Sequence, residues 1–239
     1  MTRDTLIQRL KDLGDPEKME FKRKKFGIVA NNALGVYMKD LNAIVKEIGK
    51  NNDLAVELFD SGVYEGRILC SKMFIPKDVT ESLMEKWVVT FENWEICDSF
   101  SMTLFARSPL ALQKIYEWSH RKSEFEKRAA FATMAAYCMA DKKAENSVYE
   151  KFFPILLREA TDERLYVKKA VNWALRSIGK RNPDLNKAAV ATAIQISEEN
   201  ISNKAAQWIA KDAIRELTGE KVNILDYPRA IYRPDGKKK

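Results

Sequence analysis

The amino-acid sequence predicts an all-α protein, and three observations support this prediction. Only nine glycines and seven prolines interrupt 239 residues, and most intervals between them carry apolar residues at the 3.6-residue period of a helix. None of these intervals shows the two-residue alternation and the turn chemistry that are typical of a sheet. A short motif of basic or polar residues followed by small apolar ones also opens three helices in the second half of the chain.

Capping residues place the helices along the chain. The first predicted helix covers residues 2–13, has Leu6 and Leu10 on its apolar stripe, and ends at Gly14. Asp15 then caps a second helix, which opens with Pro16 and carries a basic run at residues 22–25. Further helices are predicted at residues 38–48, 52–59, 64–73 and 79–89, within 91–105, from 108 onward, and at 124–139, 148–157, 163–178, 184–196 and 204–217.

The stretch 91–105 attracts the most interest, because it combines an aromatic side chain with a carboxylate. It begins with a turn at Glu92 and Asn93 and then reads as a helix. Trp94 and Asp98 are four residues apart, so they share one face of that helix. The buried stripe is expected to consist of Phe91, Ile96, Phe100 and Leu104.

The three motif helices indicate an internal repeat. Their first residues are Lys127-Arg128-Ala-Ala, Lys168-Lys169-Ala and Asn203-Lys204-Ala-Ala, at a spacing of roughly 35 to 41 residues, which is typical of HEAT or armadillo helix pairs. Small residues let such helices pack closely, and the basic residues at their starts could line one concave face. We therefore predict a HEAT/armadillo-like helical-repeat solenoid, with one domain over residues 1–219 and an irregular basic tail over 220–239. Coincidence among alanine-rich helices is the alternative.

Composition favours an anionic partner. The formal net charge is +7 and the isoelectric point is near 9.1, for which nucleic acid is the leading candidate. The three cysteines are far apart and the N-terminus does not read as a signal sequence, so we expect reduced thiols and a cytoplasmic protein that associates with the nucleoid through DNA. No apolar run reaches the length of about 20 residues that spans a bilayer, so no membrane partner is expected.

Several kinds of catalytic site are excluded by the residues that the chain lacks. It contains one histidine, His120, in a polar segment, and it has neither a glycine-rich phosphate loop nor cysteine spacing for zinc or iron–sulfur clusters. An enzyme with this sequence is expected to use carboxylates, aromatic rings and arginines, without a metal or a cofactor.

Three segments together resemble the AlkD-like DNA glycosylases, which are HEAT-like-repeat enzymes that excise alkylated purines. These segments are Trp94-Glu-Ile-Cys-Asp98, Glu126-Lys-Arg128-Ala-Ala, and Val167-Lys-Lys-Ala-Val-Asn-Trp173-Ala-Leu-Arg176 with Asn182-Pro183-Asp184 after it. Their order and spacing match from residues 33–36 to the helix that ends near Gly219. The resemblance implies DNA alkylation repair, with double-stranded DNA that contains N3- or N7-alkylated purines as the partner.

The resemblance also assigns roles to individual residues. It implies that Asp98 is the catalytic carboxylate and that Trp94 and Trp173 are aromatic walls against the sugar of the damaged nucleotide. Arg128 would hold the DNA backbone beside the lesion, and further DNA contacts are expected from Arg176, Lys168, Lys169 and Lys180. The sequence departs from the family at Glu95, where aspartate is frequent, and at Phe26 and Tyr37, where polar DNA contacts would be expected.

Two other functions remain open on the sequence. A HEAT-like module could bind nucleic acid or an acidic protein without catalysis, or the repeat could be a purely structural scaffold. In those cases the tryptophans would be core residues, and the basic helix starts at Arg128, Lys168 and Lys169 would be ordinary solvated surface. A monomer is expected because repeat arrays with one open face commonly act alone.

Overall fold

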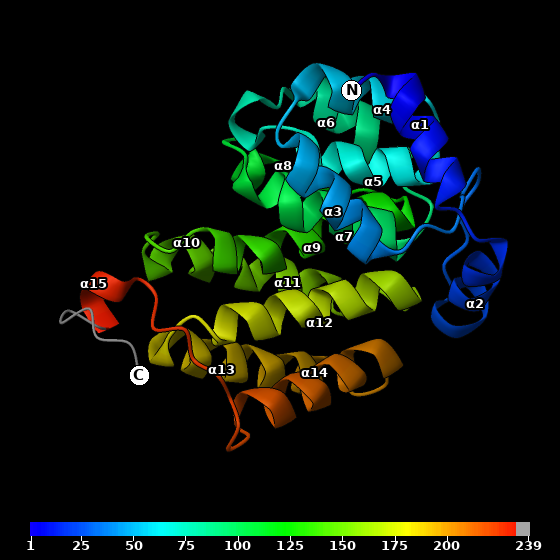
Figure 1. Cartoon of the computed structure of the whole chain (residues 1–239). Coiled ribbons are helices and arrows are strands. Elements are labelled where there is room, and N and C mark those ends of the chain that lie inside the picture. The colour runs from blue at the N-terminus through cyan, green and yellow to red at the C-terminus, as the bar shows by residue number, and fades with distance from the viewer. Residues whose placement is uncertain (233–239) are drawn as a thin grey trace. The chain divides into compact units, whose positions relative to one another are not determined.

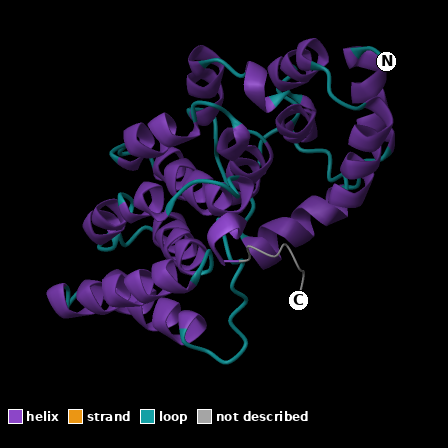
Figure 2. Cartoon of the chain, turned by 90° about the vertical axis from the view of Figure 1, so that its left-hand side faces the viewer, coloured by secondary structure: helices purple, strands orange, loops and turns teal. Residues whose placement is uncertain are grey.

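Helices and connecting loops make up all of the structure, a computed structural model that describes residues 1–232; no strand occurs in this part of the chain (Figures 1 and 2). The prediction of an all-α fold is confirmed. The chain falls into two compact units, the first from Met1 to Leu110 and the second from Ala111 onward. The single domain that the sequence suggests over residues 1–219 stays a prediction, and we describe each unit by itself.

The first unit contains seven α-helices, one of which begins at the Asp15 cap that the sequence predicts. Asp15 accepts a hydrogen bond from the backbone N–H of Glu17 at 3.0 Å, and Asn93 accepts one from Ile96 at 3.1 Å. The helix predicted at 79–89 begins later, because residues 76–78 form a 3₁₀ turn and Thr80 is the cap. The helices are α1 (Arg3–Asp12), α2 (Pro16–Phe26), α3 (Met38–Ile48), α4 (Asn52–Asp60), α5 (Tyr64–Met73), α6 (Glu81–Val88) and α7 (Trp94–Thr103).

An aromatic cluster forms the core of the first unit. Trp87 is fully buried, and the centroid of its ring system lies 5.3 Å from that of Phe74, 5.5 Å from Phe100 and 5.7 Å from Phe59. The stripe predicted for α7 is buried at all of its positions, which are Phe91, Ile96, Phe100 and Leu104. The opposite face of α7 is therefore the one that carries Trp94 and Asp98.

A buried carboxylate holds the loop between α2 and α3. Glu65 on α5 is 2% exposed, and its carboxylate oxygens accept hydrogen bonds from the backbone N–H groups of Leu34, Gly35 and Val36. Gly35 has a φ of +84°, and a Cβ there would lie 2.0 Å from the carbonyl oxygen of Asp15. Residues 33–36 are thus an anchored loop, and its contacts with Asp15 hold the start of α2.

The second unit consists of helix pairs. Its helices are α8 (Ala111–Ser119), α9 (Glu124–Ala140), α10 (Asn146–Glu150), α11 (Phe153–Glu159), α12 (Leu165–Gly179), α13 (Pro183–Glu199), α14 (Lys204–Leu217) and the short α15 (Arg229–Tyr232). The single helix predicted at 148–157 is wrong, because α10 ends at Glu150 and α11 begins afresh at Phe153. Pro154 lies in the first turn of α11, where it lacks the N–H that would continue the hydrogen bonds of α10.

The three motif helices pack as the repeat predicts. They are α9, α12 and α14, and α12 contacts both of the others (Figure 1). Ala129, Ala170 and Ala206, one from each motif, are fully buried. Small side chains at these positions let the helix backbones approach closely, so the HEAT-like repeat is present in this unit.

The segment after Gly219 returns to the end of α12. The backbone N–H groups of Leu225 and Tyr227 donate hydrogen bonds to the carbonyls of Lys180 and Arg181, each at 2.8 Å. Residues 220–228 are otherwise irregular and lead into α15, and the basic residues from 233 onward lie outside the described residues. The part of the predicted tail that is described is therefore anchored to the second unit.

Two further features bear on the expectations of reduced thiols and of no membrane partner. Cys70, Cys97 and Cys138 are all buried, and burial raises the pKa of the Cys138 thiol to about 12. Within residues 1–232, no helix combines the length and the apolar character that crossing a membrane requires.

Candidate functional site

The start of α7 is held by a buried asparagine. The side-chain oxygen of Asn93 caps the helix and also accepts a hydrogen bond from the Tyr64 hydroxyl at 3.1 Å. Its amide nitrogen donates to the carbonyl of Val29 at 3.0 Å. Because all of these partners lie in the first unit, the first turn of α7 is fixed against both α5 and the chain that follows α2.

Trp94 and Asp98 lie one turn apart on this anchored helix. The indole Nε1–H of Trp94 donates a hydrogen bond to the backbone carbonyl of Phe26 at 3.0 Å. Both side chains are half-buried. An indole ring whose orientation is fixed therefore lies on the same helical face as a carboxylate, as the four-residue spacing predicts.

Glu95, one of the departures from the family pattern, belongs to a separate network. Its carboxylate accepts hydrogen bonds from Lys22 Nζ at 2.9 Å and from the Tyr64 hydroxyl at 2.9 Å. The Lys22 and Glu95 side chains are 16% and 14% exposed. Burial first, and then the charge of Glu95, raise the pKa of Tyr64, so the phenol stays protonated and remains a donor.

This network was missed by sequence reasoning. The cap at Asn93 has a local signal, since an asparagine before a periodic apolar segment is a typical helix start. Lys22 and Glu95 are 73 residues apart in the sequence, and Tyr64 and Glu95 are 31 residues apart. No periodicity or spacing in one sequence could have paired them.

The predicted DNA-binding residues of the second unit differ in exposure. Arg128 is 6% exposed, and its Nη1 donates to the carbonyl of Tyr166 at 2.8 Å. Lys168 is half-buried with its Nζ 5.4 Å from the centroid of the Trp208 ring, whereas Lys169 is exposed. Arg128 is thus mostly covered, and Lys169 is the most accessible cation of this group.

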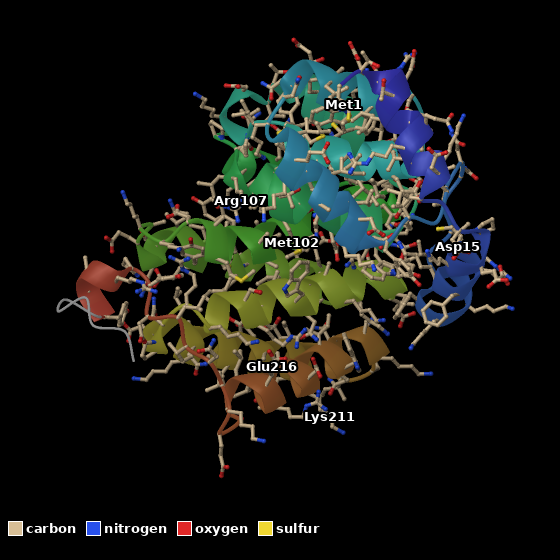
Figure 3. The ribbon with its side chains drawn as sticks, viewed as in Figure 1. Met1, Asp15, Met102, Arg107, Lys211 and Glu216 are labelled. Atoms are coloured by element: carbon tan, nitrogen blue, oxygen red, sulfur yellow. The ribbon has the colours of Figure 1, made fainter. Side chains whose placement is uncertain are left out.

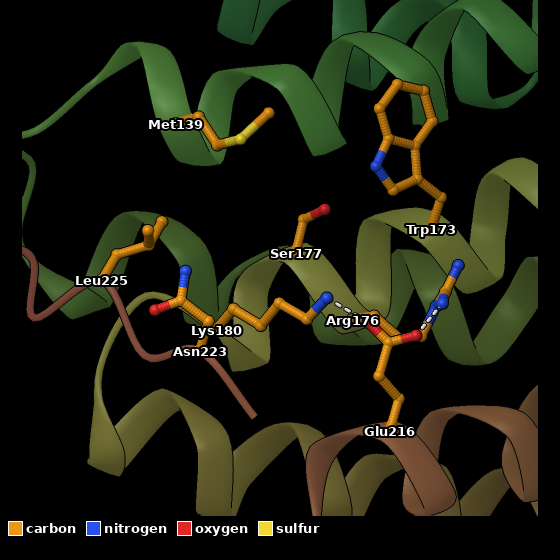
Figure 4. A pocket seen from close by; sticks show the side chains of 8 residues that line it. All are labelled: Met139, Trp173, Arg176, Ser177, Lys180, Glu216, Asn223 and Leu225. Carbon is orange, nitrogen blue, oxygen red and sulfur yellow. Dashed lines mark hydrogen bonds and ion pairs between the residues drawn. The ribbon is translucent and has the colours of Figure 1, made fainter. Parts of the chain in front are cut away.

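Trp173 lies in the wall of a cavity of about 390 Å³ in the second unit (Figure 4). Met139 lies across from it, and Arg176 and Lys180 follow it one and two turns along α12. Both of these cations form ion pairs with Glu216 of α14. Burial disfavours the ionised form of Glu216, but the hydrogen bonds from Lys180 and Arg176 outweigh it and lower the pKa of this carboxyl.

The structure thus groups the predicted residues by unit. Trp94 and Asp98 share a face of α7 in the first unit, and Trp173, Arg176 and Lys180 surround one cavity in the second. Of the remaining tryptophans, Trp87 and Trp118 are fully buried and Trp208 is 39% exposed. Residues 1–232 contain no group of three or more His, Cys, Asp or Glu side chains that could hold a metal ion.

Comparison with known proteins gives the family. The family model of the DNA alkylation repair enzyme matches residues 6–217. A solved structure, described as belonging to "a new family of proteins related to the HEAT-like repeat DNA glycosylases with affinity for branched DNA structures", is similar in fold, with a TM-score of 0.70 at 21% sequence identity over 90% of this chain and 95% of that one. No curated protein matches the chain. Because the family model covers nearly the whole sequence, this chain belongs to the DNA alkylation repair enzyme family.

Proposed function

We propose that this protein hydrolyses the N-glycosidic bond of cationic N3- or N7-alkylated purines in double-stranded DNA. The observation that carries the proposal is the Trp94–Asp98 pair, a half-buried indole and carboxylate one turn apart on a helix whose start is anchored. Membership of the DNA alkylation repair enzyme family supports the same substrate class.

The chemistry suits a site without a histidine acid. A purine alkylated at N3 or N7 already carries a positive charge, so it leaves as a neutral base when the bond from N9 to the sugar C1′ breaks and the electron pair moves to the purine. The sugar then develops positive charge, as in glycoside hydrolysis. In our proposal the Asp98 carboxylate stabilises this charge and accepts a proton from the water that forms the new bond to C1′. The Trp94 face adds a cation–π attraction of about 0.5–2 kcal/mol.

In this proposal the residues of the second unit bind DNA. Arg128 would contact the backbone beside the lesion, Trp173 would face the sugar, and Arg176, Lys168, Lys169 and Lys180 would neutralise phosphates. Phosphate contacts position the duplex without reading its sequence. Selectivity would then come from the lability of the lesion, since a cationic purine leaves more readily than a normal one. The protein would act as a monomer.

The proposal is tested by release of N3-methyladenine and N7-methylguanine from alkylated duplex DNA. We expect release by the wild type, and a rate at least about 100-fold lower for Asp98→Asn, because one preorganised electrostatic group is typically worth that much. Asp53→Asn removes an exposed carboxylate of the same unit and serves as the matched control. Absence of release by folded wild-type protein on both lesions would reject the proposal.

A second candidate is a DNA-binding protein without catalysis. The similar solved structure favours it, since that protein belongs to a family described as having affinity for branched DNA structures. This candidate predicts salt-dependent binding to three- or four-way DNA junctions that is unchanged by Asp98→Asn. Base release that depends on Asp98 would exclude it.

A further inference from the structure

A cavity of about 480 Å³ lies in the first unit, between α2, the start of α3 and the start of α7. It is separate from the cavity beside Trp173, which belongs to the second unit. Its aromatic lining residues are Phe21, Phe26 and Tyr37. Its charged lining residues are Asp15, Glu17, Lys18, Lys22 and Glu95. Asp98 does not line it. Its volume is within the range of about 300–1,000 Å³ that is usual for small-molecule sites.

The aromatic residues of this cavity are exposed to an unusual degree. Phe21, Phe26 and Tyr37 are 54%, 46% and 46% exposed, and α2 has no buried residue at all. The side chains of α2, which begins beside the labelled Asp15, extend outward from the ribbon (Figure 3). Phe21 and Phe26 contact each other edge to face, with their centroids 5.9 Å apart. Core packing therefore does not account for these rings.

Basic residues accompany the rings. Helix α2 carries five basic and two acidic residues. Lys25 Nζ lies 5.1 Å from the centroid of Phe21 and 5.7 Å from that of Phe26, and Lys18 Nζ lies 3.9 Å from the centroid of Tyr37. Each aromatic face is thus next to a cation.

We propose that this cavity stacks an unpaired nucleobase of DNA, with Lys25 close to the adjoining phosphate. Alternating aromatic rings and cations are the combination that binds single-stranded nucleic acid, because rings stack on bases while cations neutralise the backbone. An apolar protein segment or a lipid chain would not require cations beside every ring.

The base must be unpaired, because both faces of a paired base are covered by its neighbours in the duplex. A ring on this surface can therefore reach only a base that is bulged, in a gap or at a branch. This site would hold an unmodified nucleotide and is distinct from the base-release chemistry assigned to Asp98. It adds a preference for DNA structure to that proposed function.

The test uses unalkylated duplexes that contain one 2-aminopurine, either bulged or paired. We expect the wild type to bind the bulged duplex more tightly than the paired one and to quench its fluorescence by stacking. Phe21→Leu keeps an apolar side chain but removes the ring face, so affinity for the bulged duplex should fall about tenfold while affinity for the paired duplex is unchanged. Because α2 buries no residue, this variant is expected to fold, and circular dichroism checks that it does.

Tyr116→Leu is the matched control, since Tyr116 is 37% exposed but lies on α8 in the second unit. It should leave both affinities and the quenching unchanged. A bulge preference that survives Phe21→Leu would overturn the proposal, and so would a wild type that does not distinguish the two duplexes. Occupation of the cavity by a second copy of the chain would appear as a concentration-dependent mass that Phe21→Leu abolishes, and it would equally reject the nucleotide. Because no alkylated base is present, loss of base release would not affect this result.

Discussion

The indole N–H of Trp94 donates a hydrogen bond to the carbonyl of Phe26, and so ties the first residue of α7 to the last residue of α2. The two residues are 68 positions apart in the sequence. One bond therefore sets the orientation of the proposed catalytic aromatic ring and also holds the end of the basic helix. Removing the indole donor of Trp94 is therefore expected to affect both elements, whereas the acceptor at Phe26 is a backbone carbonyl that every variant keeps.

Replacing Trp94 with phenylalanine separates the ring from its hydrogen bond. Trp94→Phe keeps an aromatic face but loses the donor, so we expect the free energy of unfolding to fall by about 0.5–1.5 kcal/mol. Base release should fall as well, because the smaller ring is free to rotate. Urea unfolding and base release measure the two effects. Trp208→Phe, on an exposed tryptophan of the second unit, is the control and should leave base release unchanged.

Two glycines with a positive φ allow a test of the loop that Glu65 anchors. Gly35 has φ +84° and Gly49 has φ +77°, but a Cβ at Gly49 would meet no atom within 4 Å. Because Gly49 has φ +77° and ψ −153°, a region essentially restricted to glycine, we expect Gly49→Ala to cost only backbone strain of about 1–3 kcal/mol. Gly35→Ala should cost clearly more, since its Cβ would overlap the Asp15 carbonyl. The free energy of unfolding of each variant is measured by chemical denaturation. Equal losses in the two variants would show that the close approach of Gly35 to the Asp15 carbonyl does not matter.

The ion pairs of Glu216 lead to a prediction about DNA affinity. Glu216 binds Arg176 and Lys180, so phosphates must compete with this carboxylate for both cations. Glu216→Gln should bind duplex DNA more tightly, and the slope of log K against log salt should steepen by about 0.9 for each phosphate gained. Glu198→Gln removes the same charge from an exposed position of the same unit. A gain that is equal in the two variants would point to net charge alone.

The same carboxylate should make stability depend on pH. The pKa of Glu216 is lower in the folded protein than in the unfolded chain, so its ion pairs contribute fully to stability at pH values above the unfolded pKa. This contribution is lost as the pH falls through the folded pKa. Between pH 7 and pH 3, the melting temperature of the wild type should therefore decrease more than that of Glu216→Gln. Parallel curves for the two proteins would contradict the prediction.

Local patterns predicted much of the fold. The spacing around Trp94 and Asp98 placed the exposed and buried faces of α7, and the recurring Lys-Arg-Ala-Ala type of motif identified helices that do pack together. These features depend on residues within one or two turns of each other. By contrast, the interruption between α10 and α11 depends on a single residue, Pro154, inside an apolar run. The apolar pattern on both sides of that residue looks continuous.

Long-range polar contacts could not be predicted in this way. Arg176 and Lys180 read as cations available for phosphate, but their partner Glu216 lies 36 to 40 residues away on another helix. Lys22 and Glu95 likewise meet only because α2 and α7 fold together. Such pairs decide how much charge a surface offers to DNA, and a net charge of +7 does not reveal them.

The return of residues 225–227 to the end of α12 has a consequence for synthesis on the ribosome. Chains emerge from their N-terminus and domains generally fold as units during synthesis. The first unit has every hydrogen-bonding partner described above once residue 110 has emerged. The carbonyls of Lys180 and Arg181 receive theirs only after Tyr227 has been added. The second unit is thus completed only after residue 227 has been added, and a ribosome that stalls between Gly219 and Tyr227 would leave the end of α12 without the segment that covers it.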